Sequence, residues 1–449
     1  MSKKLLPRAN RISKLFQPLN IVPKDSKPRD EVSSKSYKLM VDMGIIRQSS
    51  NGMYNLLPLG LRALEKLNTL VDDEMANIDA QKVLLPHLIP STLWKATGRL
   101  EVAENELFML HDRHQRQYIL SPTHEEAVTS LIASVSPLSK KMLPIKLYQI
   151  SSKWRDEMKP RLGVLRGREF IMKDLYTFDA DLDKAKETYD LVCKAYDNLF
   201  QKIGVEFVKA AADTGIIGGS FSNEYHYVSN IGETVVVSCT SCNYFATTEI
   251  HNKSSCPQCQ RELCHNTSVE VGHTFLLGTK YSEPLKATYT ANGKPVPLVM
   301  GCFGLGLTRI LGAALEILSS DEELRWPRPL VPYNVCVMPP KNGSKEASAS
   351  RYADDIYQVI EQSGIDVILD DRTHFTIGKR MIDARRTGYP YIVVVGKRST
   401  EPRPMFEIHD LYEDKRLDLS FEGVIDYLRT TNDDQTTRYE MNEVRYKSN

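Results

Sequence analysis

The chain has 449 residues, and its hydrophobic content of 41% and charged content of 26% are typical of a folded globular protein with two or three domains. The net charge of +1 excludes a protein that is basic throughout, so any surface for nucleic acid must be local. No apolar run approaches the roughly 18 residues that a membrane-spanning helix requires, so no membrane partner is expected.

The first 24 residues differ from the rest of the chain, because they carry six cations and no acidic side chain. Their apolar side chains follow one helical stripe, at Ile12, Leu15, Phe16 and Leu19. A basic amphipathic start resembles a mitochondrial transit peptide, which predicts a targeting or flexible segment over residues 1–24. An ordinary basic tail, or an arm that contacts RNA, stays open as the alternative.

Two helices and a strand are predicted next. Residues 29–43 form the first helix, and residues 61–78 form a second helix with one buried apolar face. The short apolar segment 81–86 then predicts a strand that ends at a proline.

A further strand is predicted to end at Pro122, with Thr123 and Glu125 just beyond its end. A hydroxyl and a carboxylate in this position offer acceptors for the ammonium group of a ligand. The same residues also fit a capping box at the start of a helix, with Glu126 as its acidic member. The local pattern leaves both interpretations open.

Residues 148–154 and 169–178 predict an antiparallel pair of strands, joined by a loop that contains proline and glycine. Arg155 offers a planar fork for a phosphate or a carboxylate. Glu157 can accept from an exocyclic amine, and Phe170 offers a ring face for a base. These groups suit a nucleoside triphosphate, and the alternative is a surface hairpin with weak, solvated charge pairs.

The residues Trp154-Arg155-Asp156-Glu157, followed after the loop by Phe170-Ile-Met-Lys-Asp174, resemble motif 2 of class II aminoacyl-tRNA synthetases. The longer sequence KWRDEMKPRLGVLRGREFIMKD is similar to prolyl-tRNA synthetases in particular. The helix and strand of residues 61–86 resemble motif 1 of the same class, which builds the dimer interface in that family. The resemblance therefore implies a catalytic domain with an antiparallel sheet and covering helices, in a homodimer.

A third motif follows strands predicted over residues 271–277 and 296–302. Gly304 and Gly306 lead into a predicted helix with Arg309 on its first turn, and the three residues resemble the Gly-x-Gly-x-x-Arg pattern of motif 3. Glycines permit a close approach of the backbone to a nucleotide, and an arginine can stack on adenine or pair with a phosphate.

The resemblance implies a site for ATP, Mg²⁺ and L-proline. It gives the catalytic roles to Arg155, Glu157 and Arg309. It implies ATP binding by Arg155, Glu157, Arg166, Phe170, Gly304, Gly306 and Arg309. It implies proline binding by Thr123, Glu125, Arg155, Met172, Tyr176, Phe178, Gly219, Ser220 and Cys302. In the family's reaction the proline carboxylate attacks the α-phosphate of ATP, and tRNA then attacks the prolyl-adenylate.

The region between motifs 2 and 3 predicts a compact enzyme. Gly219 and Ser220 belong to a segment that resembles the loop lining the family's amino-acid pocket. Many members have a histidine where this chain has Asn223, to which no role is assigned. Only 134 residues separate Asp174 from Arg309, which leaves no room for the editing insertion of bacterial prolyl enzymes. The resemblance is therefore closest to the compact mitochondrial form.

Four cysteines follow the pattern CxxC-x13-CxxC, at Cys239, Cys242, Cys256 and Cys259. This spacing, within residues 238–262, predicts a structural Zn²⁺ site with no open position for catalysis. Disulfides and free thiols are the alternatives, and an intracellular enzyme disfavours disulfides.

The C-terminal part begins after residues 325–332, whose three prolines predict a linker. Alternating strands and helices then predict a small α/β unit, which resembles the anticodon-binding domain of prolyl, threonyl, histidyl and glycyl synthetases. The candidate anticodon contacts are Asp370, Asp371, Arg372, Lys379 and Lys397. The bare pattern fits solvated loop charges equally well, and residues 430–449 predict a loose tail.

The sequence thus predicts an α+β and α/β multidomain protein with a targeting segment (1–24), a class II catalytic domain (25–330) and an anticodon-binding domain (331–449). The predicted function is ligation of proline to tRNA(Pro) in the mitochondrial matrix, with the cytoplasm as the alternative compartment. The rivals are a threonyl-type ligase and a non-catalytic accessory protein of the same fold. Threonyl enzymes hold zinc inside the pocket, and accessory relatives usually lose the two motif arginines, which are present here as Arg155 and Arg309.

Overall fold

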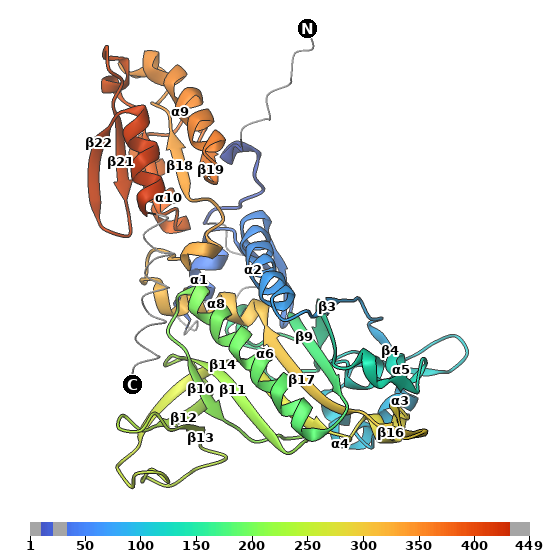
Figure 1. Ribbon diagram of the computed structural model, residues 1–449. Helices are drawn as coiled ribbons and strands as arrows, with labels where there is room; N and C mark the ends of the chain where they lie inside the picture. Colours follow the sequence, from blue (N-terminus) through green and yellow to red (C-terminus); the bar gives the residue numbers. More distant parts are fainter. Residues whose placement is uncertain (1–9, 21–33, 432–449) are drawn as a thin grey trace.

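The computed structural model describes residues 10–20 and 34–431, and it has a larger part and a smaller C-terminal domain (Figure 1). The larger part is built on a nine-stranded sheet and the C-terminal domain on a five-stranded sheet. The predicted combination of an antiparallel-sheet domain and an α/β domain is confirmed. Within the described residues, no helix combines the length and the apolar character that a membrane span needs.

The large sheet is mainly antiparallel and has the strand order β11-β10-β13-β12-β14-β17-β9-β8-β3. Its strands are β3 (Gln81–Lys82), β8 (Ile145–Trp154), β9 (Glu169–Asp179), β10 (Val208–Ala211), β11 (Phe221–Val228), β12 (Thr234–Ser238), β13 (Phe245–Thr247), β14 (Cys264–Gly278) and β17 (Val299–Gly306). The predicted pair 148–154 and 169–178 is the hairpin β8–β9, in which Lys153 lies opposite Phe170. Two neighbours, β9 and β14, flank β17 and complete the centre of the sheet.

One face of the sheet is covered by helices. These are α1 (Lys35–Asp42), α2 (Pro58–Ala76), α6 (Leu182–Ile203) and α8 (Leu307–Leu318), and α6 and α8 cross the sheet in Figure 1. The core beneath them contains Leu175 of β9 and Phe303 of β17. Helix α6 begins at Asp181, whose carboxylate caps the helix, and ends at Gly204 with φ of +78°. Because side chains alternate along a strand, the neighbours of Leu175 and Phe303 point to the opposite face.

The opposite face holds a second apolar cluster that includes Tyr176, Phe178, Phe275 and Cys302. Short elements border it: α3 (Ser91–Ala96), α4 (Leu100–Ala103), α5 (Glu125–Ala133) and α7 (Ser282–Leu285). Three small sheets complete this part: β1 (Ile46–Ser50) with β2 (Met53–Leu56); β4 (Leu88–Pro90) with β6 (Gln117–Leu120) and β5 (Met109–His111); and β16 (Lys294–Pro297) with β15 (Thr288–Ala291) and β7 (Leu138–Ser139).

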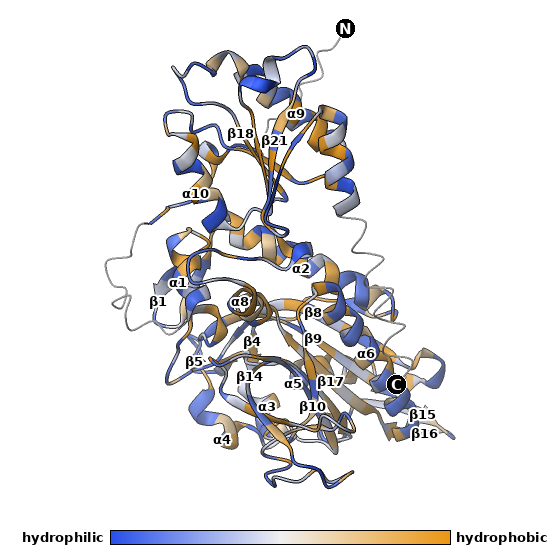
Figure 2. Ribbon diagram, turned by 90° about the vertical axis from the view of Figure 1, so that its left-hand side faces the viewer, coloured by the Kyte–Doolittle hydropathy of each residue, from blue (hydrophilic) through white to orange (hydrophobic). Residues whose placement is uncertain are grey.

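The C-terminal sheet has the order β19-β18-β20-β21-β22, in which β21 runs antiparallel to both of its neighbours, β20 and β22. Its elements are β18 (Val335–Met338), α9 (Arg351–Gln362), β19 (Val367–Leu369), α10 (Ile377–Thr387), β20 (Tyr391–Val394), β21 (Phe406–Asp410), β22 (Lys415–Leu419) and a helix over residues 421–431. Strand β18 is entirely buried and is coloured as hydrophobic in the middle of this domain in Figure 2. The sequence did not predict the β21–β22 hairpin or the last helix, and most of the predicted tail, residues 432–449, lies outside the described residues.

The predicted linker is a packed joint between the two parts. Trp326 is 1% exposed, and its Nε1 donates to the carbonyl of Thr387 at 2.8 Å. Arg62 of α2 pairs with Asp366 at 2.5 Å and lies over the ring of Tyr333. The segment that the prolines predicted to be a linker is therefore a buried connection between the two parts.

The prediction of a single strand over residues 296–302 is wrong. The chain there divides into β16, at the edge of a small sheet, and β17, at the centre of the large one. Pro295 and Pro297 lack a backbone N–H and restrict β16 to an edge. The predicted strand 81–86 is also shorter, because only Gln81 and Lys82 join the sheet.

The first described segment, residues 10–20, is packed and is not a free tail. Ile12 is 6% exposed, and the carbonyl of Asn10 accepts from the N–H of Leu369 at 2.8 Å. The other residues of the predicted targeting segment, 1–9 and 21–24, lie outside the described part of the chain. The same is true of residues 29–33 at the start of the first predicted helix, which is observed as α1.

Candidate active site

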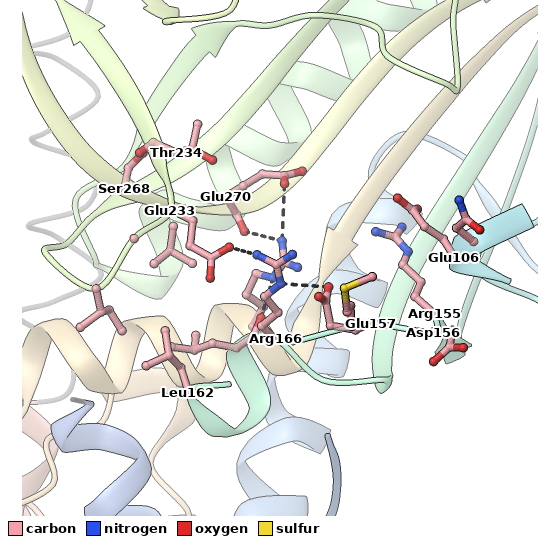
Figure 3. Close-up of a pocket in the computed structure, with 17 residues that line it drawn as sticks. Glu106, Arg155, Asp156, Glu157, Leu162, Arg166, Glu233, Thr234, Ser268 and Glu270 are labelled. Atoms are coloured by element: carbon pink, nitrogen blue, oxygen red, sulfur yellow. Dashed lines mark hydrogen bonds and ion pairs between the residues drawn. The ribbon is translucent and has the colours of Figure 1, made fainter. Parts of the chain in front are cut away.

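The candidate site is a cavity of about 480 Å³ at the loop that joins β8 to β9 (Figure 3). Its walls bring Arg155, Glu157 and Arg166 of the predicted motif 2 together with Arg309 of motif 3. A common site for the two motifs is therefore observed. Glu270 of β14 completes the wall next to Arg309.

Arg155 follows directly after β8, and its guanidinium carbon lies 5.3 Å from the centre of the Phe170 ring. Burial and the nearby charge of Arg309 hold the pKa of Arg155 below its usual value, while Glu270 and Glu125 act in the opposite direction. A guanidinium stays charged in proteins even so. Charged residues at both ends of the site therefore act on the pKa of Arg155.

Arg309 lies on the first turn of α8, as predicted. Its Nε donates to the carbonyl of Leu165 at 3.0 Å, and its Nη1 donates to the carbonyl of Glu270 at 3.0 Å. Nη1 also lies 3.5 Å from the Glu270 carboxylate. Two backbone acceptors on different elements fix the orientation of this guanidinium beside the cavity.

Arg166 and Glu157 form an ion pair of 2.9 Å across the loop of motif 2. Arg166 also pairs with Glu233, as Figure 3 shows. The Arg166 side chain is 38% exposed, and exposed pairs of this kind are weak. Both groups can therefore exchange their present partners for those of a ligand.

The glycines of motif 3 lie within strand β17 and not in a turn before the helix. Gly304 and Gly306 are on the same face of the strand as Cys302, which is the face opposite the helices. A Cβ placed on Gly304 meets nothing closer than the sulfur of Met172, at 3.7 Å. The two glycines therefore leave the surface of β17 bare on the side of the site.

Three residues that the sequence analysis did not assign form a polar cluster next to Arg309. The candidate ligand atoms of Glu224, Glu270 and His273 lie within 4.8 Å of one another. Burial acts to raise the pKa of Glu270, but His273 and Arg309 hold it well below its usual value. The cluster thus presents the ionised Glu270 carboxylate at the cavity edge.

A strand irregularity explains why this cluster forms. Glu270 and His273 are three residues apart, so a regular strand directs them to opposite faces. The register between β11 and β14 shifts at this point, which is a β-bulge and turns both side chains to the same side. The sequence signal was Gly272 inside a predicted strand, since such a glycine often marks a bulge.

The predicted proline end of the site is closed and buried. The Thr123 hydroxyl donates to Glu125 at 2.7 Å, and Glu125 also accepts from Arg99 at 3.0 Å and from the thiol of Cys302 at 3.2 Å. Burial acts to raise the pKa of Glu125, but the charge of Arg99 and the hydrogen bonds from Thr123 and Cys302 together outweigh it, and the pKa is lowered. Arg99, which the sequence analysis did not assign, therefore keeps Glu125 ionised.

A second buried cluster lies beneath Thr123 and is centred on Asp174 of β9. Asp174 pairs with Lys153 at 2.8 Å and accepts from the Tyr176 hydroxyl at 3.0 Å. That hydroxyl accepts from the N–H of His124 at 2.8 Å and lies 3.3 Å from the Thr123 hydroxyl. Tyr176 was predicted as an apolar wall, and its hydroxyl also joins Asp174 to the Thr123–Glu125 pair.

The other predicted proline contacts are spread over the same face. Met172 is half-buried on β9, whereas Phe178 is fully buried in the apolar core and supports the floor of the site without lining it. Gly219 has φ of +113°, and a Cβ there lies 2.4 Å from the carbonyl of Leu276, so only glycine fits. Ser220 is exposed beside it and donates its N–H to Leu276.

The four predicted zinc ligands form one cluster. The sulfurs of Cys239 and Cys259 are 3.4 Å apart, as are those of Cys242 and Cys256. These distances exceed the roughly 2.05 Å of a disulfide, so the four thiols are separate. Thr234 at one end of β12 lines the cavity, and Cys239 follows the other end, so the cluster lies outside the site.

Comparison with known proteins assigns the chain to a family. The model of the tRNA synthetase class II core domain (G, H, P, S and T) matches residues 108–318, and the anticodon binding domain matches residues 334–431. A probable mitochondrial proline–tRNA ligase of Rattus norvegicus is 47% identical over 93% of this chain and 90% of the relative. The corresponding protein of Homo sapiens is 46% identical, over 94% and 92%.

The chain belongs to the class II prolyl-tRNA synthetase family. A proline–tRNA ligase of Wolbachia from Drosophila simulans is also 34% identical, over 94% of this chain and 100% of the relative. The threonyl-type alternative is thereby set aside. Solved structures of prolyl-tRNA synthetases share the fold of this chain. Their sequence identities are low, so this similarity supports the fold alone.

The crystal structure of Cryptosporidium parvum prolyl-tRNA synthetase complexed with L-proline and AMP matches with a TM-score of 0.74 at 17% identity, over 92% of this chain and 77% of that one. The Giardia lamblia enzyme in complex with prolyl-adenylate matches with a TM-score of 0.76 at 18% identity, over 91% and 82%.

The anticodon candidates of this prolyl-tRNA synthetase differ in how accessible they are. Asp370 is fully buried, and its two oxygens accept from Arg372 at 2.9 and 2.8 Å. Direct contact of Asp370 with a base is therefore the wrong interpretation, because its carboxylate serves to hold Arg372. Lys379 pairs with Asp383 at 2.8 Å and is half-exposed, and Lys397 is exposed. Asp371 is bonded to the N-terminal segment.

Proposed function

We propose that this chain activates L-proline with ATP and transfers it to tRNA(Pro) in the mitochondrial matrix. In the first step an oxygen of the proline carboxylate attacks the α-phosphate of ATP, which forms prolyl-adenylate and releases pyrophosphate. In the second step the terminal ribose hydroxyl of tRNA attacks the carbonyl carbon of the adenylate and releases AMP. Such chemistry depends on positioning and on neutralising charge more than on a general base.

The position of Arg155 supports this proposal most directly. Arg155 lines the cavity together with Arg309 and Glu270 at the nucleotide end, and it directly follows β8, whose Lys153 pairs with Asp174 beneath the proline end. A single guanidinium between the two ends can bind the proline carboxylate and the α-phosphate at once. That is the geometry which the first step requires, because the two reacting groups are both anions.

The remaining roles follow from the two ends. Thr123 and Glu125 accept hydrogen bonds from the secondary ammonium of proline, and Phe170 and Arg309 hold the adenine from its two faces. Glu270 and Glu224 are the oxygen ligands that would hold Mg²⁺, which prefers carboxylates and neutralises phosphate charge when bound. His273 orients the Glu270 carboxylate from 3.4 Å.

The test is exchange of labelled pyrophosphate into ATP with single amino acids as the driver. Proline should drive exchange, and threonine, alanine or no amino acid should not. Charging of tRNA(Pro) with labelled proline tests the second step separately. Exchange driven by threonine, or independent of any amino acid, contradicts the assignment. Absence of all exchange in the folded protein instead favours the non-catalytic accessory interpretation.

We further propose that the four cysteines hold a structural Zn²⁺. Tetrahedral ligation with Zn–S bonds of about 2.3 Å places the sulfurs roughly 3.8 Å apart, close to the separation observed for both pairs. The ion would join the loop after β12 to the segment before β14, where buried apolar side chains are few. Small modules of this kind often depend on the metal to fold.

Elemental analysis of protein purified without chelator tests the zinc site. About one zinc ion per chain is expected, as for other four-thiolate sites. Cys239→Ser should lose the ion, whereas Cys264→Ser, at an exposed cysteine outside the cluster, should retain it. Zinc-free wild-type protein, or equal loss in both variants, contradicts the site.

The mitochondrial matrix and the homodimer are part of the same proposal. The basic start of the chain and the mitochondrial relatives support the compartment. The motif 1 resemblance of α2 and β3 supports the dimer, and Leu84, which follows β3, exposes 75% of its surface in the single chain. Protease protection in isolated mitochondria tests the compartment, and light scattering of the purified protein tests the dimer.

A further inference from the structure

We propose that residues 10–20 form a permanent strap of the mature enzyme, which positions the anticodon turn, residues 370–372, for tRNA. The proposal rests on the proposed ligase function but concerns only its tRNA-dependent step. It also places the processing site of the precursor before Asn10, although the basic composition that resembles a transit peptide continues to residue 24. Ser13 and Asp371 are the positioning residues.

The strap begins as an added edge of the C-terminal sheet. The carbonyl of Asn10 accepts from the N–H of Leu369 at 2.8 Å, and the N–H of Asn10 donates to the Tyr357 hydroxyl at 2.9 Å. Arg11 forms a parallel bridge with Leu369, the last residue of β19. Backbone pairing to a sheet edge is a specific mode of attachment, because register is set by main-chain bonds.

The strap then binds the anticodon turn itself. The N–H of Ser13 donates to one oxygen of Asp371 at 3.0 Å, and the Ser13 hydroxyl donates to the other at 2.7 Å. Both oxygens of Asp371 are thus occupied from one residue. The next residue, Arg372, is fixed by Asp370 from the other side. The strap thus holds Asp371, whereas Asp370 and Asp383 hold the Arg372 guanidinium, whose side chain is 12% exposed at the edge of the same turn.

The other end of the strap is attached to the larger part of the molecule. Gln17 donates to the carbonyl of Met43 at 3.0 Å, and the N–H of Asn20 donates to the carbonyl of Asp42 at 2.7 Å. The Asn20 side chain also accepts from Arg386 of α10 at 2.7 Å. The strap therefore crosses the joint between the two parts, as its place beside β19 and above α2 in Figure 1 shows.

Three of the four residues in the apolar stripe that predicted a targeting helix pack in the folded chain, whereas Phe16 is 69% exposed and only a 3₁₀ turn, Ile12–Lys14, forms. Ile12 is buried in the main core, and Leu15 and Leu19 pack against that core. Pro18 lies so close to Gly44 that a Cβ on the glycine would be 2.9 Å from the proline ring. A segment with this many specific contacts at both ends is a part of the mature fold, and its removal would expose buried side chains.

Two assays distinguish positioning from general stability, because proline activation uses residues of the larger part alone. Ser13→Pro removes both donors to Asp371, and proline suits the short 3₁₀ turn in which Ser13 lies, where its N–H makes no other bond. Ser13→Thr keeps both donors and serves as the matched control. Ser13→Pro should raise the KM for tRNA(Pro) about tenfold, as for loss of hydrogen bonds to a charged group.

In the same variant, proline-dependent pyrophosphate exchange and the KM for proline should stay within about twofold of wild type, since no contact of the strap reaches the proline end. Ser13→Thr should match wild type in both assays. A wild-type KM for tRNA in Ser13→Pro overturns the proposal, and so does a parallel loss of exchange, which indicates damage to the fold. Failure of exchange in the wild-type protein would contradict the ligase assignment and not the strap.

Mass spectrometry of the N-terminal peptide of the mitochondrial protein gives an independent test. The mature chain should begin at or before Asn10. A later start removes the bridge to Leu369 and overturns the proposal.

Discussion

The proline end and the nucleotide end of the active site are built in opposite ways. At the proline end, Glu125 and Asp174 are buried, with side chains 0% and 1% exposed, and each is paired with a buried cation. At the nucleotide end, the side chains of Arg166 and Arg309 are 38% and 30% exposed. In the proposed reaction, proline would be selected by charges that are fixed before binding, whereas ATP would meet cations that are partly exposed to solvent.

The two constructions predict different consequences of mutation. Breaking a buried ion pair leaves an uncompensated charge and destabilises a protein by roughly 3–5 kcal/mol, whereas an exposed pair contributes about 0–1 kcal/mol. Substitutions at the proline end should therefore affect stability and proline binding together. Substitutions at the nucleotide end should affect activity and leave stability almost unchanged.

The largest effect is expected for Arg155→Ala, which removes the group shared by both ends. Proline-dependent pyrophosphate exchange should fall about 1,000-fold, the upper range for loss of one preorganised charge-stabilising group. Circular dichroism and the thermal midpoint should match wild type. Arg161→Ala is the control, because Arg161 is 58% exposed on the same loop. Wild-type exchange by Arg155→Ala refutes the role of Arg155.

Two buried lysines on opposite faces of the sheet provide the next test. Lys153 pairs with Asp174 beneath the proline end, so Lys153→Met should lower the free energy of unfolding by about 3 kcal/mol. Lys173 faces the helices and donates to the Tyr196 hydroxyl and the carbonyl of Phe303. Burial lowers the pKa of Lys173 to about 7, so this lysine is already half neutral near that pH.

Lys173→Met should consequently destabilise by only about 1 kcal/mol, the contribution of an ordinary hydrogen bond. Denaturation by urea at neutral pH measures both variants. Equal destabilisation by the two substitutions would show that burial alone, and not pairing with Asp174, sets the stability of the proline end.

The third effect concerns proline affinity. Tyr176→Phe keeps the ring but removes the hydroxyl that joins Asp174 to Thr123. The KM for proline should rise about tenfold, and the KM for ATP should not change. Tyr227→Phe is the matched control, because the buried hydroxyl of Tyr227 has no hydrogen-bond partner among the described residues. A rise in the KM for ATP instead of proline would remove the distinction between the two ends.

The site residues that the sequence predicted are defined by local motifs, whereas those that it missed are defined by contacts that only the folded chain makes. Arg155, Glu157 and Arg309 could be predicted because each lies in a short motif with fixed spacing. Arg99 was missed because its pairing with Glu125 depends on how α4 approaches α5, which no local pattern encodes. No local pattern encodes the contacts between residues that only the pairing of strands brings together.

The fold shows the same division. The periodic helix predicted over residues 61–78 is observed as α2, Pro58–Ala76, because its apolar face repeats along the chain. The break between β16 and β17 and the bulge at Gly272 were missed, because both depend on which sheet accepts the strand. The strap was interpreted as a targeting segment, since a basic amphipathic sequence suits both membrane transport and packing on an acidic turn.

The smallest effect is expected for Arg166→Ala. Arg166 already balances Glu157 and Glu233, so its removal leaves two carboxylates near the triphosphate and should raise the KM for ATP only about threefold. The unfolding free energy should change by less than about 0.5 kcal/mol. The increase in KM should also shrink at high salt, because exposed charges are screened over about one Debye length. The defect of Arg155→Ala should persist at high salt, since Arg155 is buried deeply enough to lower its pKa and such a charge is screened much less. Equal salt sensitivity of the two variants would argue that both arginines act from the surface.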